Sequence, residues 1–150
     1  MPQLDSVVRF EGETTLLELV DALSTGSDWH SVHGIAYCDH GQVVATPARA
    51  LVEDLDELPF PERNYEPQVV LGRNMMPLIA SRGCARTCSF CSIHTFYRAA
   101  PGKIVRTRKP SEVVREMRML YEDRGCSEPY GDAGPASLWT NYIAMTYRER

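Results

Sequence analysis

The stretch Met76-Pro-Leu-Ile-Ala-Ser-Arg-Gly-Cys-Ala-Arg-Thr-Cys-Ser-Phe-Cys91 carries the strongest structural signal in this sequence. Residues 76–80 are mostly apolar and predict a short buried strand. Three cysteines follow, Cys84, Cys88 and Cys91, in the spacing Cys-x-x-x-Cys-x-x-Cys. Because loops that follow buried strands commonly carry the chemistry of a protein, these cysteines are the first candidate functional residues.

The spacing of the three thiols predicts an iron–sulfur site. In a reducing compartment, clustered cysteines indicate metal binding rather than disulfides. Thiolate is the soft ligand that iron–sulfur clusters require, and short spacers let three thiolates reach three corners of one 4Fe–4S cube. We therefore predict Cys84, Cys88 and Cys91 as metal ligands that leave one iron open.

A structural zinc site is the alternative. Zinc requires four closed ligands, so His94, Cys126 or Cys38 would have to complete the set. Zinc-binding loops usually come as paired Cys-x-x-Cys units, and here only Cys88 and Cys91 form such a pair. Outside a metal site, Cys38 and Cys126 are predicted to be buried or free thiols.

The residues after the cysteine loop predict a helix over 110–124. Pro110 suits the first helical turn and Gly125 ends the run. The expected apolar face consists of Val113, Val114, Met117, Leu120 and Tyr121. Strand, loop and helix in this order make a βα unit, so the fold class is predicted to be α/β.

Two short segments follow the cysteines in the sequence. His94, Tyr97 and Arg98 are expected on a short helix, where ordinary packing is the preferred interpretation. Arg106, Arg108 and Lys109 are expected to form a solvated basic turn, although they could also meet an anionic group of a ligand.

The N-terminal part predicts a strand over 7–10, a helix that begins near Thr14 or Thr15 and ends at Gly26, and a β-hairpin over 34–46. The helix carries an apolar stripe at a 3.6-residue period: Leu16, Leu17, Leu19, Val20 and Leu23. An acidic segment with several prolines follows from residue 47. Because proline fixes φ and removes a backbone donor, this segment is predicted to be an extended linker between two modules.

Composition narrows the classes of function. Residues 1–66 hold 13 acidic and 3 basic residues, whereas residues 67–124 hold 11 basic and 4 acidic ones. The basic segment lacks the interleaved aromatic residues that stack on bases, so no nucleic acid is expected. No apolar run reaches the ~20 residues of a membrane span, and the N-terminus is unlike a signal peptide, which predicts a cytoplasmic protein.

The run CSFCSIHTFYRAAPGKIVRTRKPSEVVREMRMLYEDRG, residues 88–125, resembles radical S-adenosylmethionine (SAM) enzymes of the cobalamin-binding group. The segments VVRFEGE (7–13) and LVEDLDELPFPERNY (51–65) look like the end of such a cobalamin domain and its linker. The resemblance implies the first βα unit of a partial (β/α)6 barrel. Its expected divisions are a C-terminal remnant of a cobalamin-binding-like domain (1–46), an acidic linker (47–73), the start of the radical SAM domain (74–125) and an irregular tail (126–150).

The resemblance also implies a chemistry. In that superfamily the open iron of the 4Fe–4S cluster binds SAM, which is cleaved reductively to a 5′-deoxyadenosyl radical. The aromatic residue before the last cysteine, here Phe90, lies near the adenine. Gly83 is expected to relax the backbone where it enters the loop. An electron donor such as a flavodoxin or ferredoxin and a small-molecule substrate are the implied partners. One βα unit does not enclose a radical, so the chain alone is expected to be too short for catalysis.

Three departures from the family pattern stand out. Asp28-Trp29-His30 begins like the Asp-x-His-x-x-Gly cobalamin signature, but the glycine falls one place late, at Gly34, so His30 is not assigned to cobalt and no cobalamin site is expected here. Phe10 stands where relatives commonly have glycine. After Gly125, where a second apolar strand is expected, the composition changes abruptly, which suggests a frameshifted or truncated gene or a non-functional product.

Overall fold

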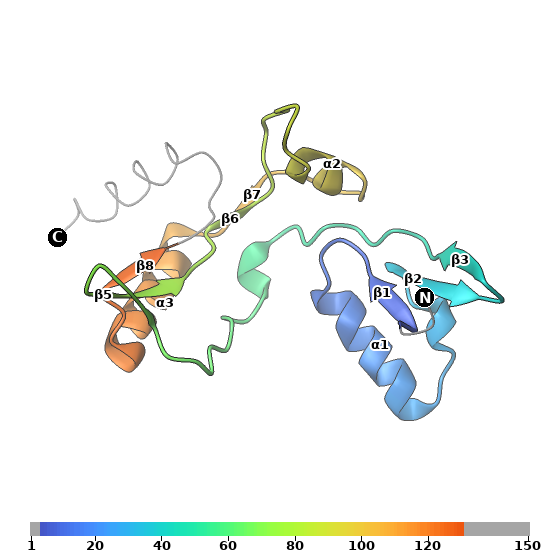
Figure 1. Cartoon of the computed structure of the whole chain (residues 1–150), viewed down its shortest axis with the longest axis horizontal. Coiled ribbons are helices and arrows are strands. Elements are labelled where there is room, and N and C mark those ends of the chain that lie inside the picture. Colours follow the sequence, from blue (N-terminus) through green and yellow to red (C-terminus); the bar gives the residue numbers. More distant parts are fainter. Residues whose placement is uncertain (1–3, 131–150) are drawn as a thin grey trace. The chain divides into compact units, whose positions relative to one another are not determined.

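The computed structural model describes residues 4–130 (Figure 1). These residues divide into two compact units. The first unit contains residues 4–52 and 87–104, and the second contains residues 53–86 and 105–130. Both combine helices with β-sheet, so the α/β class is confirmed. No helix within residues 4–130 has the length and apolar character needed to cross a bilayer.

A three-stranded antiparallel sheet organises the first unit. Its order is β1 (Ser6–Val8), β2 (Ile35–Asp39), β3 (Gln42–Ala45). The predicted hairpin is confirmed: β2 and β3 pair, and both residues between them, His40 and Gly41, have positive φ angles. Such angles match the right-handed twist of paired strands, which is why this two-residue turn closes the hairpin.

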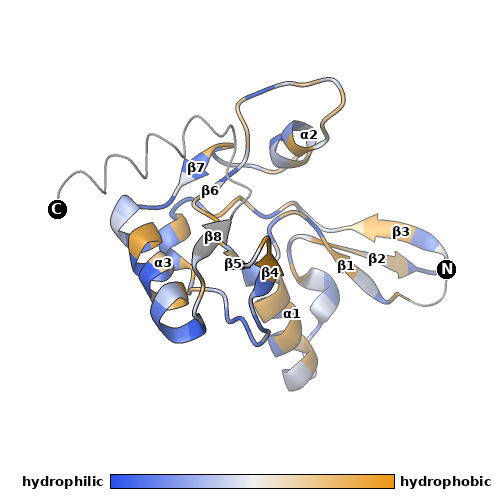
Figure 2. Cartoon of the chain, turned by 60° about the vertical axis from the view of Figure 1, so that its left-hand side comes forward, coloured by the Kyte–Doolittle hydropathy of each residue, from blue (hydrophilic) through white to orange (hydrophobic). Residues whose placement is uncertain are grey.

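Helix α1 (Glu13–Thr25) lies in the same unit, and its end at Gly26 is confirmed by a left-handed φ of 70°. The predicted apolar stripe is wrong, however. Of its five members only Leu19 is buried, whereas Leu16, Leu17, Val20 and Leu23 are 52–62% exposed. Figure 2 shows this helix as a largely hydrophobic ribbon. The buried face of the helix consists instead of Thr15, Leu19 and the partly buried Ala22. A shift of one residue turns a helix face by about 100°.

The core of the first unit is small. It consists of Leu19, Val32 and Ile35, with Trp29 of the 3-10 turn η1 (Trp29–Ser31) packed at its edge. Thr15 is fully buried, and its hydroxyl donates to the carbonyl of His33 at 3.2 Å. The polar group therefore has a hydrogen-bond partner although it is shielded from water.

Residues 87–104 join this unit through helix α2 (Ile93–Arg98), the predicted short helix. Phe96 of α2 meets Phe10 edge to face, with 5.5 Å between ring centroids. Further along, the backbone N–H of Leu51 donates to the carbonyl of Pro101 at 2.8 Å. The segment that follows the cysteines is therefore held against the N-terminal part of the chain.

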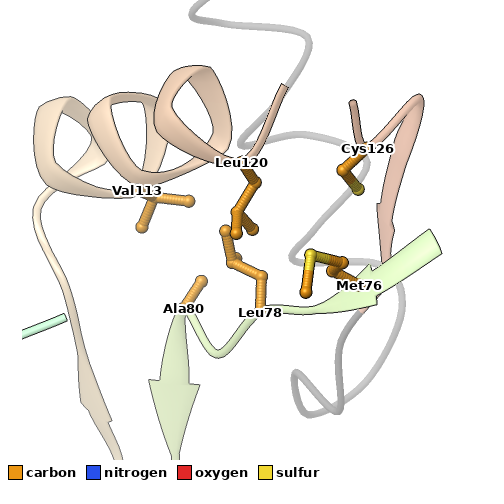
Figure 3. Close-up of a cluster of buried hydrophobic side chains, with 6 residues drawn as sticks. All are labelled: Met76, Leu78, Ala80, Val113, Leu120 and Cys126. Atoms are coloured by element: carbon orange, nitrogen blue, oxygen red, sulfur yellow. The ribbon is translucent and has the colours of Figure 1, made fainter. Parts of the chain in front are cut away.

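The second unit is a βαβ arrangement. Its sheet has the order β4 (Gln68–Val70), β5 (Arg73–Pro77), β8 (Glu128–Tyr130), and β5 and β8 run parallel on either side of helix α3 (Pro110–Arg124) in the sequence. Figure 3 shows Val113 and Leu120 of α3 pointing toward the apolar residues of the segment that contains β5. The buried cluster consists of Met76, Leu78, Ala80, Val113, Leu120 and Cys126.

The predicted helix over 110–124 is confirmed with both of its ends. Pro110 occupies the first turn, and Gly125 adopts a left-handed φ of 61° after the last turn. The predicted strand over 76–80 is shifted, because β5 covers residues 73–77. Tyr121, expected on the apolar face of the helix, is exposed.

The expectation of an extended linker over 47–73 is wrong in part. This segment contains a 3-10 turn, η2 (Leu55–Glu57), and strand β4, which pairs with β5. Leu51 and Leu55 are buried. Proline removes donors locally, but apolar side chains between the prolines still gain from burial and fix the segment.

The expectation of an irregular tail from residue 126 is corrected for its first residues. Residues 128–130 form β8, the parallel strand expected after such a helix. Parallel pairing uses backbone groups, so it needs no periodic pattern of side chains. The rest of the predicted tail, 131–150, lies outside the described residues.

Candidate metal centre

The cysteine loop is closed at its base by a short ladder. Strand β6 (Ser81–Arg82) precedes the loop, and strand β7 (Arg106–Thr107) follows it. The two strands lie side by side (Figure 1). They pair antiparallel, with Ser81 opposite Thr107. Cys84 therefore lies only two residues beyond a point where the chain is fixed by backbone hydrogen bonds.

Gly83 connects this ladder to the first cysteine, and its φ is +84°. Residues with a Cβ atom rarely adopt this angle, because Cβ then approaches the following carbonyl oxygen. The expectation that glycine relaxes the backbone here is confirmed. The turn redirects the chain directly before Cys84.

All three thiols of the loop are free. Cys84 is half-buried, and its Sγ accepts from the backbone N–H of Arg86 at 3.4 Å. The N–H of Cys91, which is also half-buried, donates to the carbonyl of the exposed Cys88 at 3.1 Å.

The three predicted ligands are divided between the two units. Cys84 belongs to the second unit, and Cys88 and Cys91 belong to the first. Within residues 4–130, no three His, Cys, Asp or Glu side chains are grouped around one metal position. The donor set nevertheless suits an iron–sulfur cluster, because it is three soft thiols free of disulfides. Ligation by these cysteines stays a prediction.

Two other predicted residues lie in the same loop region. Phe90 is 92% exposed, so its ring is accessible to a ligand, and its proposed place near an adenine stays a prediction. His94 is half-buried, and its Nε2 lies 3.3 Å from the hydroxyl of Thr95. The Nδ1 atom of His94 is buried without a hydrogen-bond partner.

The remaining cysteines differ from one another. Cys126 is buried in the apolar cluster of the second unit, next to Met76 and Leu78 (Figure 3), and Cys38 is exposed on β2. The interpretation of both as ordinary buried or free thiols is consistent with these positions.

His30 contacts residues of the 3-10 turn and of strand β2. Its ring meets Tyr37 of β2 edge to face, with 4.8 Å between centroids. Its Nδ1 lies 2.9 Å from Asp28 Oδ1, and its ring stacks on Trp29 at 3.9 Å between centroids. These hydrogen bonds from the side chain and backbone N–H of His30 lower the pKa of Asp28 from its ordinary value of 3.8. Asp28 thereby caps the 3-10 turn η1.

The basic turn after the loop is not solvated, which corrects that expectation. Arg106 is 2% exposed and Arg108 is 9% exposed, while the side chain of Lys109 reaches solvent. For Arg108 the physical reason is a buried carboxylate. Glu116 is fully buried on α3, and Arg108 Nη1 donates to its Oε2.

A second guanidinium meets the same carboxylate. Arg63, from the supposed linker, donates from Nη2 to Glu116 Oε1 at 2.6 Å. Glu116 was missed as a site residue from the sequence, although one signal was available. It lies three residues after Val113 and four before Leu120, so it falls on the buried face of the helix. A carboxylate in an apolar stripe implies a buried cationic partner.

Comparison with known proteins shows which proteins this chain resembles in sequence. No family model matches the sequence. An uncharacterised methyltransferase of Pyrococcus horikoshii is 35% identical over 85% of this chain and 28% of its own length. An anaerobic magnesium-protoporphyrin IX monomethyl ester cyclase of Rubrivivax gelatinosus is 40% identical over 81% of this chain and 22% of its own length.

Solved structures agree on the fold. The radical SAM methyltransferase TsrM of Kitasatospora setae, solved with tryptophan and a SAM analogue, superposes with a TM-score of 0.67 at 22% identity over 97% of this chain and 28% of its own. Its form with cobalamin and a [4Fe–4S] cluster gives 0.65.

The fold is thus that of a radical SAM protein. The chain is similar in sequence to a methyltransferase and to a magnesium-protoporphyrin IX monomethyl ester cyclase and in fold to a radical SAM methyltransferase, so the resemblance is confirmed. It spans about a quarter of the length of these curated relatives.

Proposed function

We propose that this chain carries the cluster-binding segment of a radical SAM enzyme, with Cys84, Cys88 and Cys91 as ligands of a 4Fe–4S cluster. The observation that carries the proposal is the spacing of three free thiols directly after β6, in a chain that is similar in sequence to a methyltransferase and a cyclase and in fold to the radical SAM methyltransferase TsrM. When bound, the cluster supplies an electron that cleaves SAM to a 5′-deoxyadenosyl radical.

The chain's own residues have defined parts in this proposal. Three thiolates hold three irons and leave the fourth for SAM. Phe90 offers an exposed ring to the adenine. The positive φ of Gly83 turns the backbone so that Cys84 follows directly after the β6–β7 ladder.

The partners follow from the same chemistry. A reducing compartment such as the cytoplasm keeps the thiols free, and a flavodoxin or ferredoxin there would supply the electron. The substrate would be a small molecule, as tryptophan is for TsrM. Cobalamin belongs to the full-length family in this proposal, since no residue of this chain is assigned to it.

Anaerobic reconstitution with iron and sulfide tests the ligands. The unsubstituted chain should take up about four irons and become brown, with broad absorbance near ~400 nm. Cys84→Ala, Cys88→Ala and Cys91→Ala should each abolish this cluster, because two thiolates cannot hold the cube with an open site. Cys38→Ala, at an exposed thiol outside the loop, is the matched control and should bind iron normally.

Two results would contradict the proposal. One is stoichiometric zinc that resists exchange for iron, which would indicate a closed four-ligand site. The other is unchanged iron binding after any of the three loop substitutions. Since one βα unit does not shield a radical from water, no turnover of SAM by the 150-residue chain alone is expected.

A further inference from the structure

Four charged side chains form a buried cluster that the proposed function does not use. Glu116 is fully buried, and the side chains of Arg63, Arg108 and Asp56 are 6–9% exposed. Both oxygens of Glu116 accept from a guanidinium, Oε1 from Arg63 and Oε2 from Arg108. Asp56 Oδ1 lies 3.6 Å from Arg108 Nε, so two cations face two carboxylates.

The cluster is tied to the backbone that enters the cysteine loop. Arg108 Nη1 donates to the carbonyl of Ile79 at 2.9 Å, and Arg63 Nη2 donates to the carbonyl of Pro77 at 2.8 Å. The backbone N–H of Arg108 donates to the carbonyl of Ala80, also at 2.9 Å. These three carbonyls belong to the segment that leads into β6 and Cys84.

The same cluster holds the backbone that leaves the loop. Arg108 follows β7 directly, and the N–H of Lys109 donates to Asp56 Oδ2 at 2.8 Å. Glu116 therefore fixes, through Arg108, the residues on both sides of the loop. The loop between β6 and β7 spans residues 83–105, and a ladder of two residue pairs joins its ends.

Stability alone gives a weak reason for such a cluster. The second unit already has an apolar core between α3 and the segment that contains β5. Burying ions carries a desolvation cost that often exceeds their attraction, so apolar residues of similar volume would serve a core at least as well. What apolar residues do not supply is a set of directed bonds to the carbonyls of Pro77 and Ile79.

We propose that Glu116 is a positioning residue for the metal-binding loop, acting through Arg108. The inference rests on the proposed function, because it assigns the fixed loop ends to cluster binding. A ligand whose backbone is already ordered loses less conformational entropy when it binds metal, so the cluster is held longer. Residues behind metal ligands commonly tune affinity by 10–100-fold.

The first test is Glu116→Gln in the full chain, which keeps the shape of the side chain and removes its charge. After anaerobic reconstitution, iron transfer to a chelator should be about tenfold faster or more than in the unsubstituted chain. Glu112→Gln is the matched control on the same helix. Glu112 forms an exposed ion pair with Arg115, and its loss should leave the rate unchanged.

A second variant separates positioning from stability. Arg63→Met, Arg108→Met and Glu116→Leu, combined with Asp56→Asn so that no buried charge is left unpaired, should restore or exceed the unfolding midpoint of the unsubstituted chain. If Glu116 positions the loop, iron loss stays fast in this variant although stability is regained. A return to the slow rate would show a role in stability alone and would overturn the inference.

A measurement on the chain without metal distinguishes failure of the positioning role from failure of the cluster-binding proposal. In the apo chain, Glu116→Gln should raise the alkylation rate of the half-buried Cys84 relative to the exposed Cys38, measured by mass spectrometry. Equal alkylation ratios and equal rates of iron loss would overturn the positioning role while leaving the cluster proposal intact. Absence of iron uptake by the unsubstituted chain would overturn the proposed function itself.

Discussion

Phe10 and Gly83 both have positive φ angles, yet only one of them is a glycine. Phe10 has a φ of 61°, an angle that favours glycine, which is the residue that the family resemblance leads us to expect at this position. The ring compensates through two contacts. It packs edge to face on Phe96, and the Arg9 guanidinium lies 5.0 Å from its centroid.

Substitutions at Phe10 should reverse the usual order of alanine and glycine. Phe10→Ala loses both ring contacts and keeps a Cβ in the left-handed region, whereas Phe10→Gly loses the contacts but relieves that strain. We expect the glycine variant to be more stable than the alanine variant by about 1 kcal/mol in urea unfolding. An alanine variant at least as stable as the glycine variant would refute this explanation of the backbone.

Asp28 is the residue at which pH should act on the local structure. Its hydrogen bonds with His30 lower its folded-state pKa below 3.8. A depressed carboxyl pKa contributes stability above the unfolded value, and the contribution is lost as pH falls through the folded pKa. The cap of η1 should therefore weaken only under acid conditions.

Carbon NMR of the Asp28 carboxyl group checks this expectation. The titration midpoint should lie below 3.8 in the unsubstituted chain and move upward, toward the ordinary value, in His30→Ala. The backbone N–H of residue 30 still donates in that variant, so the return should be partial. A midpoint unchanged by His30→Ala would contradict the side-chain hydrogen bond as the main cause.

At the scale of elements, helices α1 and α3 show two ways in which a periodic pattern misleads. Leucines occupy two adjoining faces of α1, and only the face through Thr15 and Leu19 meets the sheet of its unit. In α3 the pattern of Val113 and Leu120 is buried as expected, but the charged Glu116 shares their face. Periodicity identified both helices, whereas the buried side depended on the neighbouring segments.

Core and surface leucines of α1 should therefore differ sharply in their effect on stability. Leu19→Ala removes a buried side chain and should cost about 2–5 kcal/mol of unfolding free energy. Leu17→Gln keeps helix propensity at an exposed site and should change it by no more than about 0.5 kcal/mol. Urea unfolding of both variants checks this difference. If the apolar stripe predicted from the sequence were buried instead, both leucines would be buried and both substitutions would lower the free energy of unfolding strongly.

At the scale of the whole molecule, the parallel pairing of β5 with β8 defines the βαβ unit of the second half. Hydrogen bonds outside the helix also stabilise this pairing. Ser127 donates its backbone N–H to the carbonyl of Asn74 at 2.9 Å, and Asn74 Nδ2 donates to the carbonyl of Gly125 at 3.1 Å. These bonds join residues about fifty positions apart, so composition after Gly125 gave no sign of them.

The sequence by itself determined the features that a few neighbouring residues control. The ends of α1 and α3 follow from Gly26, Pro110 and Gly125, the hairpin turn follows from His40-Gly41, and the candidate ligands follow from cysteine spacing. Each depends on local backbone geometry, which the residues at those positions restrict directly.

Only the tertiary structure decided which side chains are buried and what they meet. Glu116 and Arg63 are 53 residues apart in sequence, and their contact turns a supposed linker and a supposed solvated turn into one buried cluster. Burial and charge pairing depend on which distant segments come together, because water is excluded only by the assembled fold. The helix pattern marks Glu116 as buried, but no pattern within that segment identifies Arg63 and Arg108 as its partners.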